Sequence, residues 1–256
     1  RFHHKALVDE FVRSLSFRAN VKSLVTAMLA LERLGLPTES LRAPFLQHLS
    51  GQCHELSFGD LRRVLMTLAR CTSGGAVQSA QLREICDEIH EKATDCDPRD
   101  LLVIPQHLGR LQFLHPPLLA RSTHAISRLI SSRLTVLPLD VLRAWDGLLL
   151  LTSLVEGEAQ DQLKQLASKC KLLGNRMLQE GSTTELWSLG SQLLGSDILH
   201  VQIWSLWFNE AMRRGSTSSS NANANSGKLR RQMLKQWSLQ TLPEELELLL
   251  SQKIAG

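Results

Sequence analysis

The sequence predicts an all-α fold, an α-solenoid of about five helical hairpins, from three observations. Leu supplies 51 of the 256 residues, against 19 for Val and Ile together. Tyr is absent, and Phe and Trp together number 12. Because Leu favours helices while β-branched and aromatic residues favour strands, this composition argues against an all-β fold. The third observation is a Leu-rich helical pattern that recurs every 37–44 residues.

The recurring pattern is a Leu followed seven positions later by another Leu, usually with a small residue and a base just after. Seven residues are nearly two helical turns, so both leucines lie on one face of a helix. We therefore predict five first helices, each carrying one copy of the pattern. The copies begin at Leu24, Leu61, Leu101, Leu142 and Leu186.

A second amphipathic segment follows each first helix, and Gly, Pro and Ser at the joins indicate helix ends. One hairpin cannot bury its apolar face alone, whereas stacked hairpins bury a continuous core. Residues 1–214 are therefore predicted to form one helical-repeat array; the alternative is an irregular helical bundle with similar helices. The second segments are Glu39–Leu49, Ser79–Lys92, Pro117–Ser132, Asp161–Leu173 and Ile198–Arg213.

The rest of the chain has a different composition. Residues 215–227 are rich in Ser, Asn and Ala, which is typical of a linker. Residues 228–256 are predicted to form a basic segment followed by a C-terminal capping helix over Pro243–Ile254, whose first acids suit the positive end of a helix.

The stretch Leu56–Arg70 resembles the first helix of an octotricopeptide or heptatricopeptide repeat, with its Asp60-Leu61 pair, its Leu65 and its Ala69-Arg70 ending. Asn20–Leu34 is similar, and the resemblance extends over about residues 20–195. Such repeats occur in the RAP and FAST-kinase-like group, whose members are mostly organellar RNA-binding factors or components of organellar ribosomes. Only about 30 residues follow Gly227, so a RAP domain is not expected.

Localisation is predicted from this resemblance and from simple sequence features. We expect the mitochondrial matrix, with a transit peptide removed or lying outside the sequence, since the chain begins at Arg1. The longest apolar run is Ala27–Leu31, and runs such as Leu148–Leu151 are shorter still, far below the ~18 residues that a membrane span needs. Five scattered Cys without a CxxC motif favour a reducing compartment.

Catalytic and cofactor motifs are not found in the sequence. It contains no GxGxxG, no GxxxxGK[ST], no HExxH and no GxSxG. Cys86 and His90 are spaced to share a helix face, but a buried thiol and a surface His explain them more simply than a metal site. We expect no enzymatic activity, no cofactor, no metal and no small-molecule substrate.

Charge is the most informative signal for function. The net charge is only +4, yet no acid occurs in the 39 residues between Asp100 and Asp140. Within this stretch Arg121 and Arg128 are predicted to form a stripe on one helix face with His124. Guanidinium groups bind phosphate bidentately, so the stripe favours RNA phosphates over the alternatives of a solvated face or an acidic protein. The predicted phosphate-binding residues here are Arg110, Arg121, His124, Arg128 and Arg133.

A second stretch without acids runs from Ala211 to Pro243. Its predicted phosphate-binding residues are Arg213, Arg214, Lys228, Arg230, Arg231 and Lys235. Together these features predict a non-enzymatic helical-repeat RNA-binding protein, a structural component of the mitochondrial ribosome that contacts rRNA phosphates and neighbouring proteins. The alternative is a protein–protein scaffold or accessory subunit of another mitochondrial complex.

Overall fold

The computed structural model describes residues 10, 13, 20–33, 45–49, 51–71, 79–132, 136–196, 198 and 200–217. Every regular element within these ranges is a helix, and they contain no strand, so the predicted all-α class is confirmed. The elements are α2 (Val21–Arg33), η1 (Cys53–Glu55), α4 (Phe58–Cys71), α5 (Ser79–Lys92), η2 (Pro98–Leu101), α6 (Ile104–Arg110), α7 (Pro116–Ser131), α8 (Pro138–Thr152), α9 (Gly157–Glu180), α10 (Thr183–Leu194) and α11 (Val201–Thr217).

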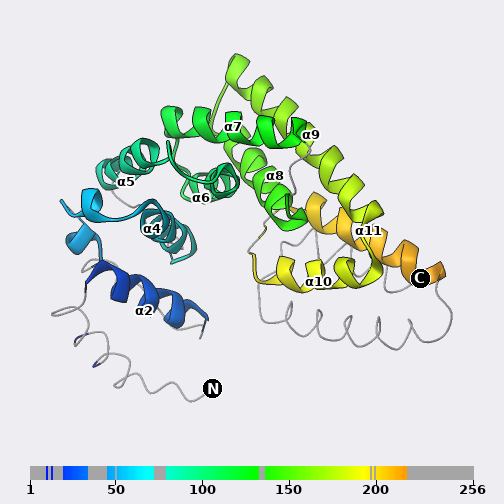
Figure 1. The fold of residues 1–256 in the computed structure, drawn as a ribbon, viewed down its shortest axis with the longest axis horizontal. Helices are drawn as coiled ribbons and strands as arrows, with labels where there is room; N and C mark the ends of the chain where they lie inside the picture. The colour runs from blue at the N-terminus through cyan, green and yellow to red at the C-terminus, as the bar shows by residue number, and fades with distance from the viewer. Residues whose placement is uncertain are drawn as a thin grey trace.

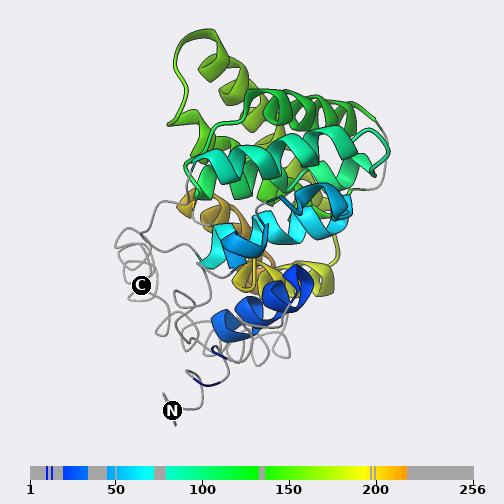
Figure 2. The ribbon, with the colours of Figure 1, turned by 90° about the vertical axis from the view of Figure 1, so that its left-hand side faces the viewer.

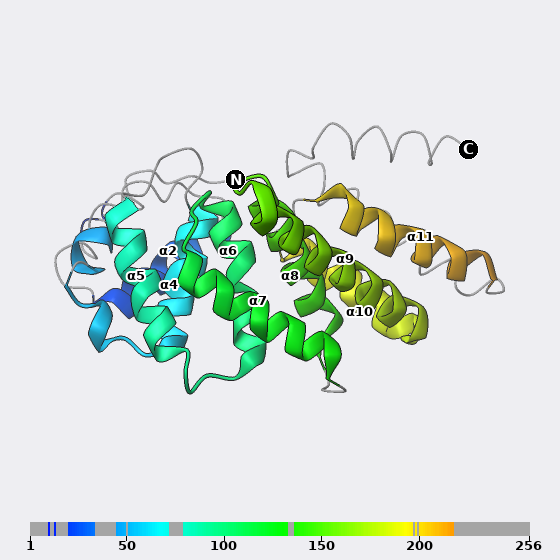
Figure 3. The same cartoon turned by 90° about the horizontal axis from the view of Figure 1, so that it is seen from above.

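The helices form two layers that follow a curve (Figure 1). In the inner layer α2 packs on α4, α4 on α6, α6 on α8, and α8 on α10. In the outer layer α5 packs on α7, α7 on α9, and α9 on α11. Each outer helix also contacts the inner helix that precedes it in the chain. Figure 2 shows α2 in blue, α4 in cyan and the green helices one above the next, and Figure 3 looks onto α7 and α9.

Two of the predicted second segments match helices closely, whereas two others do not. The predicted second segment Ser79–Lys92 is α5, and the segment Pro117–Ser132 is displaced by one residue from α7. The segment Asp161–Leu173 is only the middle of α9 (Gly157–Glu180), and Ile198–Arg213 begins three residues before α11 (Val201–Thr217). The starting leucines lie on α2, α4, α8 and α10, and on η2 for the third copy. One difference is at the end of α11, which reaches Thr217 and so includes the first three residues of the predicted linker. The rest of that linker and residues 228–256 lie outside the described residues.

The helix that carries the third copy of the Leu pattern is shorter than the Leu101–Leu108 spacing predicts. Pro105 lies in the first turn of α6, where its missing N–H is not needed, so the helix begins at Ile104. The preceding residues form η2, whose N-cap Asp97 accepts a hydrogen bond from the backbone N–H of Arg99. Leu101 and Leu108 are both buried, although they belong to different elements.

The patterned leucines build the core, with one correction. Leu24, Leu61 and Leu68 are no more than 1% exposed. Leu149, which the fourth copy of the pattern pairs with Leu142, is only partly buried. Helix α8 lies between α6 and α9 and buries residues on more than one face, and Leu148 and Leu151 fill the core instead.

Tryptophan side chains contribute to the core. Trp145 and Trp207 are almost completely buried. The ring of Trp207 meets that of Trp187 edge to face at a centroid distance of 5.9 Å, and its indole N–H donates to the Leu186 carbonyl at 2.8 Å. Trp237 lies outside the described residues. Separately, none of the helices in the described ranges combines the length and apolarity that crossing a membrane requires.

Helices α6 and α8 approach each other at backbone contact. A Cβ added to Gly147 would overlap the backbone of Pro105 and Gln106, and one added to Gly109 would overlap the Cβ of Leu150. Backbone atoms at the crossing cannot rotate away as a flexible side chain can, so the two helices depend on these glycines to pack at this distance. The sequence analysis did not identify either residue.

Gly147→Ala should therefore destabilise the protein by about 1–3 kcal/mol or more, because the added methyl forces α6 away from α8. Gly59→Ala is the matched control. Gly59 is exposed in α4, and its added Cβ would come only within 3.9 Å of the Ser57 hydroxyl. That change should be neutral or stabilising by up to about 1 kcal/mol. Urea denaturation measures both, and equal effects would contradict the proposed close contact.

Candidate nucleic-acid interface

The predicted stripe lies on α7, in the outer layer. His124 and Arg128 are exposed, whereas Arg121 is partly buried. The Arg121 guanidinium donates to the His90 carbonyl at 2.6 Å and to the Thr94 hydroxyl at 3.3 Å. It thereby satisfies a carbonyl at the C-terminal end of α5, where a cation is favourable. One member of the stripe is thus engaged within the fold, while the other two face solvent.

The two arginines near the end of α11 are also engaged. Both Arg213 and Arg214 donate to the Glu210 carboxylate, at 2.5 Å and 2.7 Å. These guanidinium groups lower the pKa of Glu210 to about 2. Arg214 additionally donates to the carbonyls of Leu178, Gln179 and Gly181, so it closes the C-terminal end of α9. The remaining predicted residues Arg133, Lys228, Arg230, Arg231 and Lys235 lie outside the described residues.

A basic pocket of about 270 Å³ lies among the inner helices, and of the predicted residues it contains only Arg110. Arginines from α4, η2, α6 and α8 line it, together with two carboxylates and the turn that follows α10. We refer to this hollow as the arginine pocket. Its arginines are Arg62, Arg63, Arg70, Arg99, Arg110 and Arg143, and its carboxylates are Asp100 and Asp140.

The recurring Leu pattern explains why arginines gather here. Arg62 and Arg143 each directly follow the starting leucine of one copy of the pattern, and Arg70 and Arg110 each lie two residues after the closing leucine. All four of those leucines are buried, so they fix how each helix is rotated about its axis. Because α4, α6 and α8 stack in order, bases at equivalent positions reach the same side.

One lining residue of the arginine pocket, Gln106, belongs to a buried polar link. The Gln106 amide donates to the Asp146 carboxylate at 2.9 Å, and that carboxylate also accepts from the backbone N–H of His200 at 3.0 Å. Gln106 and Asp146 are at most 2% exposed. Burial raises the pKa of Asp146, while these donors oppose the rise. The link joins α6 and α8 to the start of α11.

His107 reports the electrostatic potential of the arginine pocket. Burial first, and then the charges of Arg110, Arg143, Arg62 and Arg70, lower the pKa of His107 to about 3. The charged neighbours that contribute most to this shift are all arginines. Acids do compensate part of the charge: Asp100 pairs with Arg62 at 2.5 Å, Glu32 with Arg70 at 3.6 Å, and Asp97 with Arg99 at 2.5 Å. Arg63 is exposed and has no ionic partner among the described residues.

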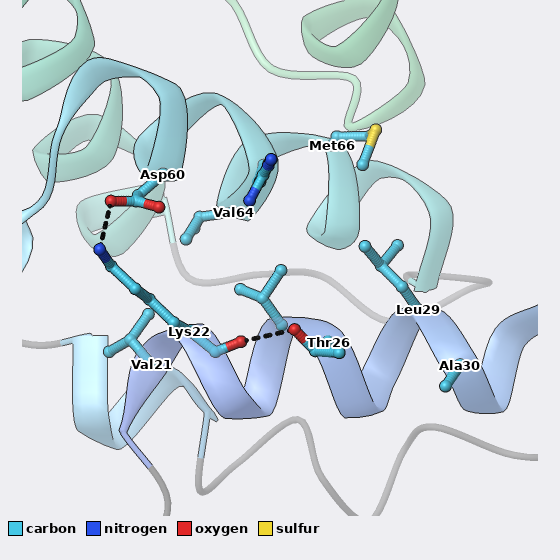
Figure 4. Close-up of a pocket in the computed structure, with 10 residues that line it drawn as sticks. Val21, Lys22, Thr26, Leu29, Ala30, Asp60, Val64 and Met66 are labelled. Carbon is cyan, nitrogen blue, oxygen red and sulfur yellow. Dashed lines mark hydrogen bonds and ion pairs between the residues drawn. The ribbon is translucent and has the colours of Figure 1, made fainter.

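A second hollow, of about 370 Å³, adjoins the arginine pocket between α2 and α4 (Figure 4). Arg63 and Met66 line both hollows, which makes them neighbours. Its walls are mostly aliphatic, and Figure 4 shows Lys22 reaching from α2 to Asp60 at 2.9 Å. The inner side of α4 therefore presents an aliphatic hollow next to a basic one.

Five arginines of the pocket, Arg62, Arg63, Arg70, Arg99 and Arg143, were not predicted as binding residues. The signal was present, since a base recurs beside the leucines of successive copies of the pattern. A count of net charge over successive stretches of the sequence concealed this recurring base. Helix α5 carries Glu84, Asp87 and Glu88, which offset the arginines of α4 in such a count although they line a separate surface hollow.

No other kind of site is evident in the described part of the chain. No cluster of three or more His, Cys, Asp or Glu within those residues could hold a metal ion. Cys86 is buried, and burial raises the pKa of its thiol to about 12, as expected for a core residue rather than a ligand.

Comparisons with known proteins add no identification. The sequence matches no protein-family model. It also matches no curated protein.

The low pKa of His107 makes stability depend on pH. An ordinary His takes up a proton near pH 6.5, but folded His107 does so only near pH 3. The unfolded state therefore binds more protons between these values, and stability should fall by up to about 1.4 kcal/mol per pH unit on acidification from 6.5 towards 3. His107→Gln should make the fall shallower, whereas exposed His124→Gln should leave it unchanged. Denaturation at a series of pH values measures this, and parallel profiles would contradict it.

Proposed function

We propose that the protein is a non-enzymatic RNA-binding helical-repeat protein that holds RNA phosphates in the arginine pocket. The observation that carries this proposal is the convergence of six arginines from four elements on one hollow. A guanidinium presents paired N–H donors that match the oxygens of a phosphate, and it is always charged. Phosphate contacts of this kind supply most of the affinity of nucleic-acid-binding proteins.

The helix arrangement supports a repeat array. The five Leu-rich segments correspond to successive inner elements, and four of the inner helices are each followed by an outer helix that packs on them. In such an array each hairpin contributes the same face, so a binding surface is built from equivalent positions of neighbouring repeats. The base that recurs beside the patterned leucines meets this requirement.

The resemblance to organellar helical repeats directs the choice of RNA and compartment. We propose mitochondrial ribosomal RNA as the ligand, with the protein acting as a structural component of the particle. The exposed Arg128 and His124 on α7 would then provide a second phosphate contact on the outer layer. The sequence predicts this outer contact on α7, and it remains a prediction.

A protein–protein scaffold is the second candidate, and one observation favours it. Leu172 on α9 is 71% exposed and Met212 on α11 is 54% exposed. Exposed apolar side chains on the last outer helices would suit a protein neighbour. In a ribonucleoprotein both surfaces would be used, so the decisive measurement is whether the isolated chain binds RNA through the arginine pocket.

Two triple variants with equal loss of charge test the proposal. Arg63→Gln, Arg99→Gln and Arg143→Gln change the arginine pocket. Arg121→Gln, Arg128→Gln and Arg133→Gln change the outer stripe together with the predicted phosphate-binding arginine that follows α7 in the sequence. Binding of a labelled single-stranded RNA is measured by fluorescence anisotropy over a range of salt concentrations. The pocket variant should bind more weakly whatever the RNA sequence, and its salt slope should be smaller by about 0.7 per lost phosphate contact.

The salt slopes of the two variants show whether RNA binds to the arginine pocket or to the outer stripe on α7. A reduced slope only in the outer-stripe variant would move the interface to α7 and overturn the arginine pocket as its location. Unchanged slopes in both variants, or no RNA binding by the wild type, would favour the scaffold. Thermal denaturation verifies that each variant is folded.

A further inference from the structure

Asp140 differs from the other carboxylates around the arginine pocket. It lies in the first turn of α8 and lines the hollow, partly buried. Asp100 pairs with Arg62, Asp97 with Arg99, and Asp146 accepts from Gln106 and His200. The Asp140 carboxylate accepts no hydrogen bond and forms no ion pair within the described residues.

The surroundings of Asp140 leave it poorly solvated. Burial raises the pKa of Asp140, and nearby Asp100 contributes in the same direction, whereas Arg143, Arg62 and Arg99 oppose it. A partly buried carboxylate without a donor is costly, because it has lost water without gaining a partner. A ligand that supplies a donor at this point gains a charge-assisted hydrogen bond.

The combination of acid and arginines restricts what the hollow accepts. A bare phosphate satisfies the guanidinium groups but is repelled by Asp140. A ribonucleotide offers a phosphate and, next to it, a 2′-hydroxyl that can donate a hydrogen bond. Deoxyribose lacks that donor and would leave the carboxylate unpaired beside a second negative charge.

We propose that Asp140 selects RNA over DNA by accepting a hydrogen bond from a ribose 2′-hydroxyl, while the adjacent phosphate lies against Arg143 and Arg99. This inference rests on the proposed function, since it assigns a specificity-determining residue to the same pocket. The competing explanation is structural. An acid in the first turn stabilises a helix through the helix dipole, and such a role would not distinguish two nucleic acids.

The test compares three labelled oligonucleotides of one sequence: RNA, DNA and 2′-O-methyl RNA, measured by fluorescence anisotropy at fixed salt. Wild type should bind RNA tighter than the other two by roughly tenfold or more, the worth of one hydrogen bond to a charged group. Asp140→Ala should weaken RNA binding and leave DNA binding unchanged or tighter, so the preference falls towards one. A further RNA lacks only the 3′-hydroxyl of its last nucleotide. It should bind as tightly as the parent RNA if Asp140 contacts an internal ribose, and more weakly if Asp140 contacts the terminal diol.

Asp97→Ala is the matched control. It removes a carboxylate beside Arg99 that does not line the hollow, so it should change RNA and DNA binding by the same factor. If Asp140→Ala also changes both by one factor, or if wild type does not discriminate, the role of Asp140 is overturned while phosphate binding stands. If wild type binds neither RNA nor DNA, the proposed function fails as well. Should Asp140→Ala not fold, equal binding of RNA and 2′-O-methyl RNA by the wild type would still overturn the proposal.

Discussion

The contact of α6 with α8 is the constraint on which the rest of the structure depends. Gly147 lies against the backbone of α6, so these two inner helices meet without side chains between them. This approach lets Gln106 reach Asp146, and Asp146 in turn holds the backbone at His200. A wider spacing would break a hydrogen-bond link at a carboxylate that is fully buried. Broken buried links of this kind are costly because the charged group is left without partners.

The same contact determines the shape of the arginine pocket. Arg110 lies at the end of α6 and Arg143 in the first half of α8, so their separation follows from how the two helices cross. Arg62 and Arg63 come from α4, which packs on α6 but not through glycines. One wall of the hollow is therefore fixed by backbone contact, and the facing wall is held by side chains and by the pairing of Arg62 with Asp100.

Sequence reasoning succeeded for the helices because their signal is local. The period of buried leucines and the Gly or Pro at the joins place α5 and α7 to within one residue. It placed Leu149 in the core wrongly because α8 is covered on more than one side, which a seven-residue spacing cannot reveal. It missed most of the arginine pocket because that site joins residues about 40 positions apart, such as Arg62 and Asp100. Which residues become neighbours depends on how the helices pack, and a count of charge along the chain mixes the two layers.

The engagement of Arg214 has a consequence for how α11 can leave the fold. A nearly buried guanidinium ties α11 to three carbonyls of α9 and to Glu210. All of these hydrogen bonds belong to one side chain, so withdrawal of that side chain breaks them together. The separation of α11 from α9 should therefore be a concerted event at this point and not a gradual loss of contacts.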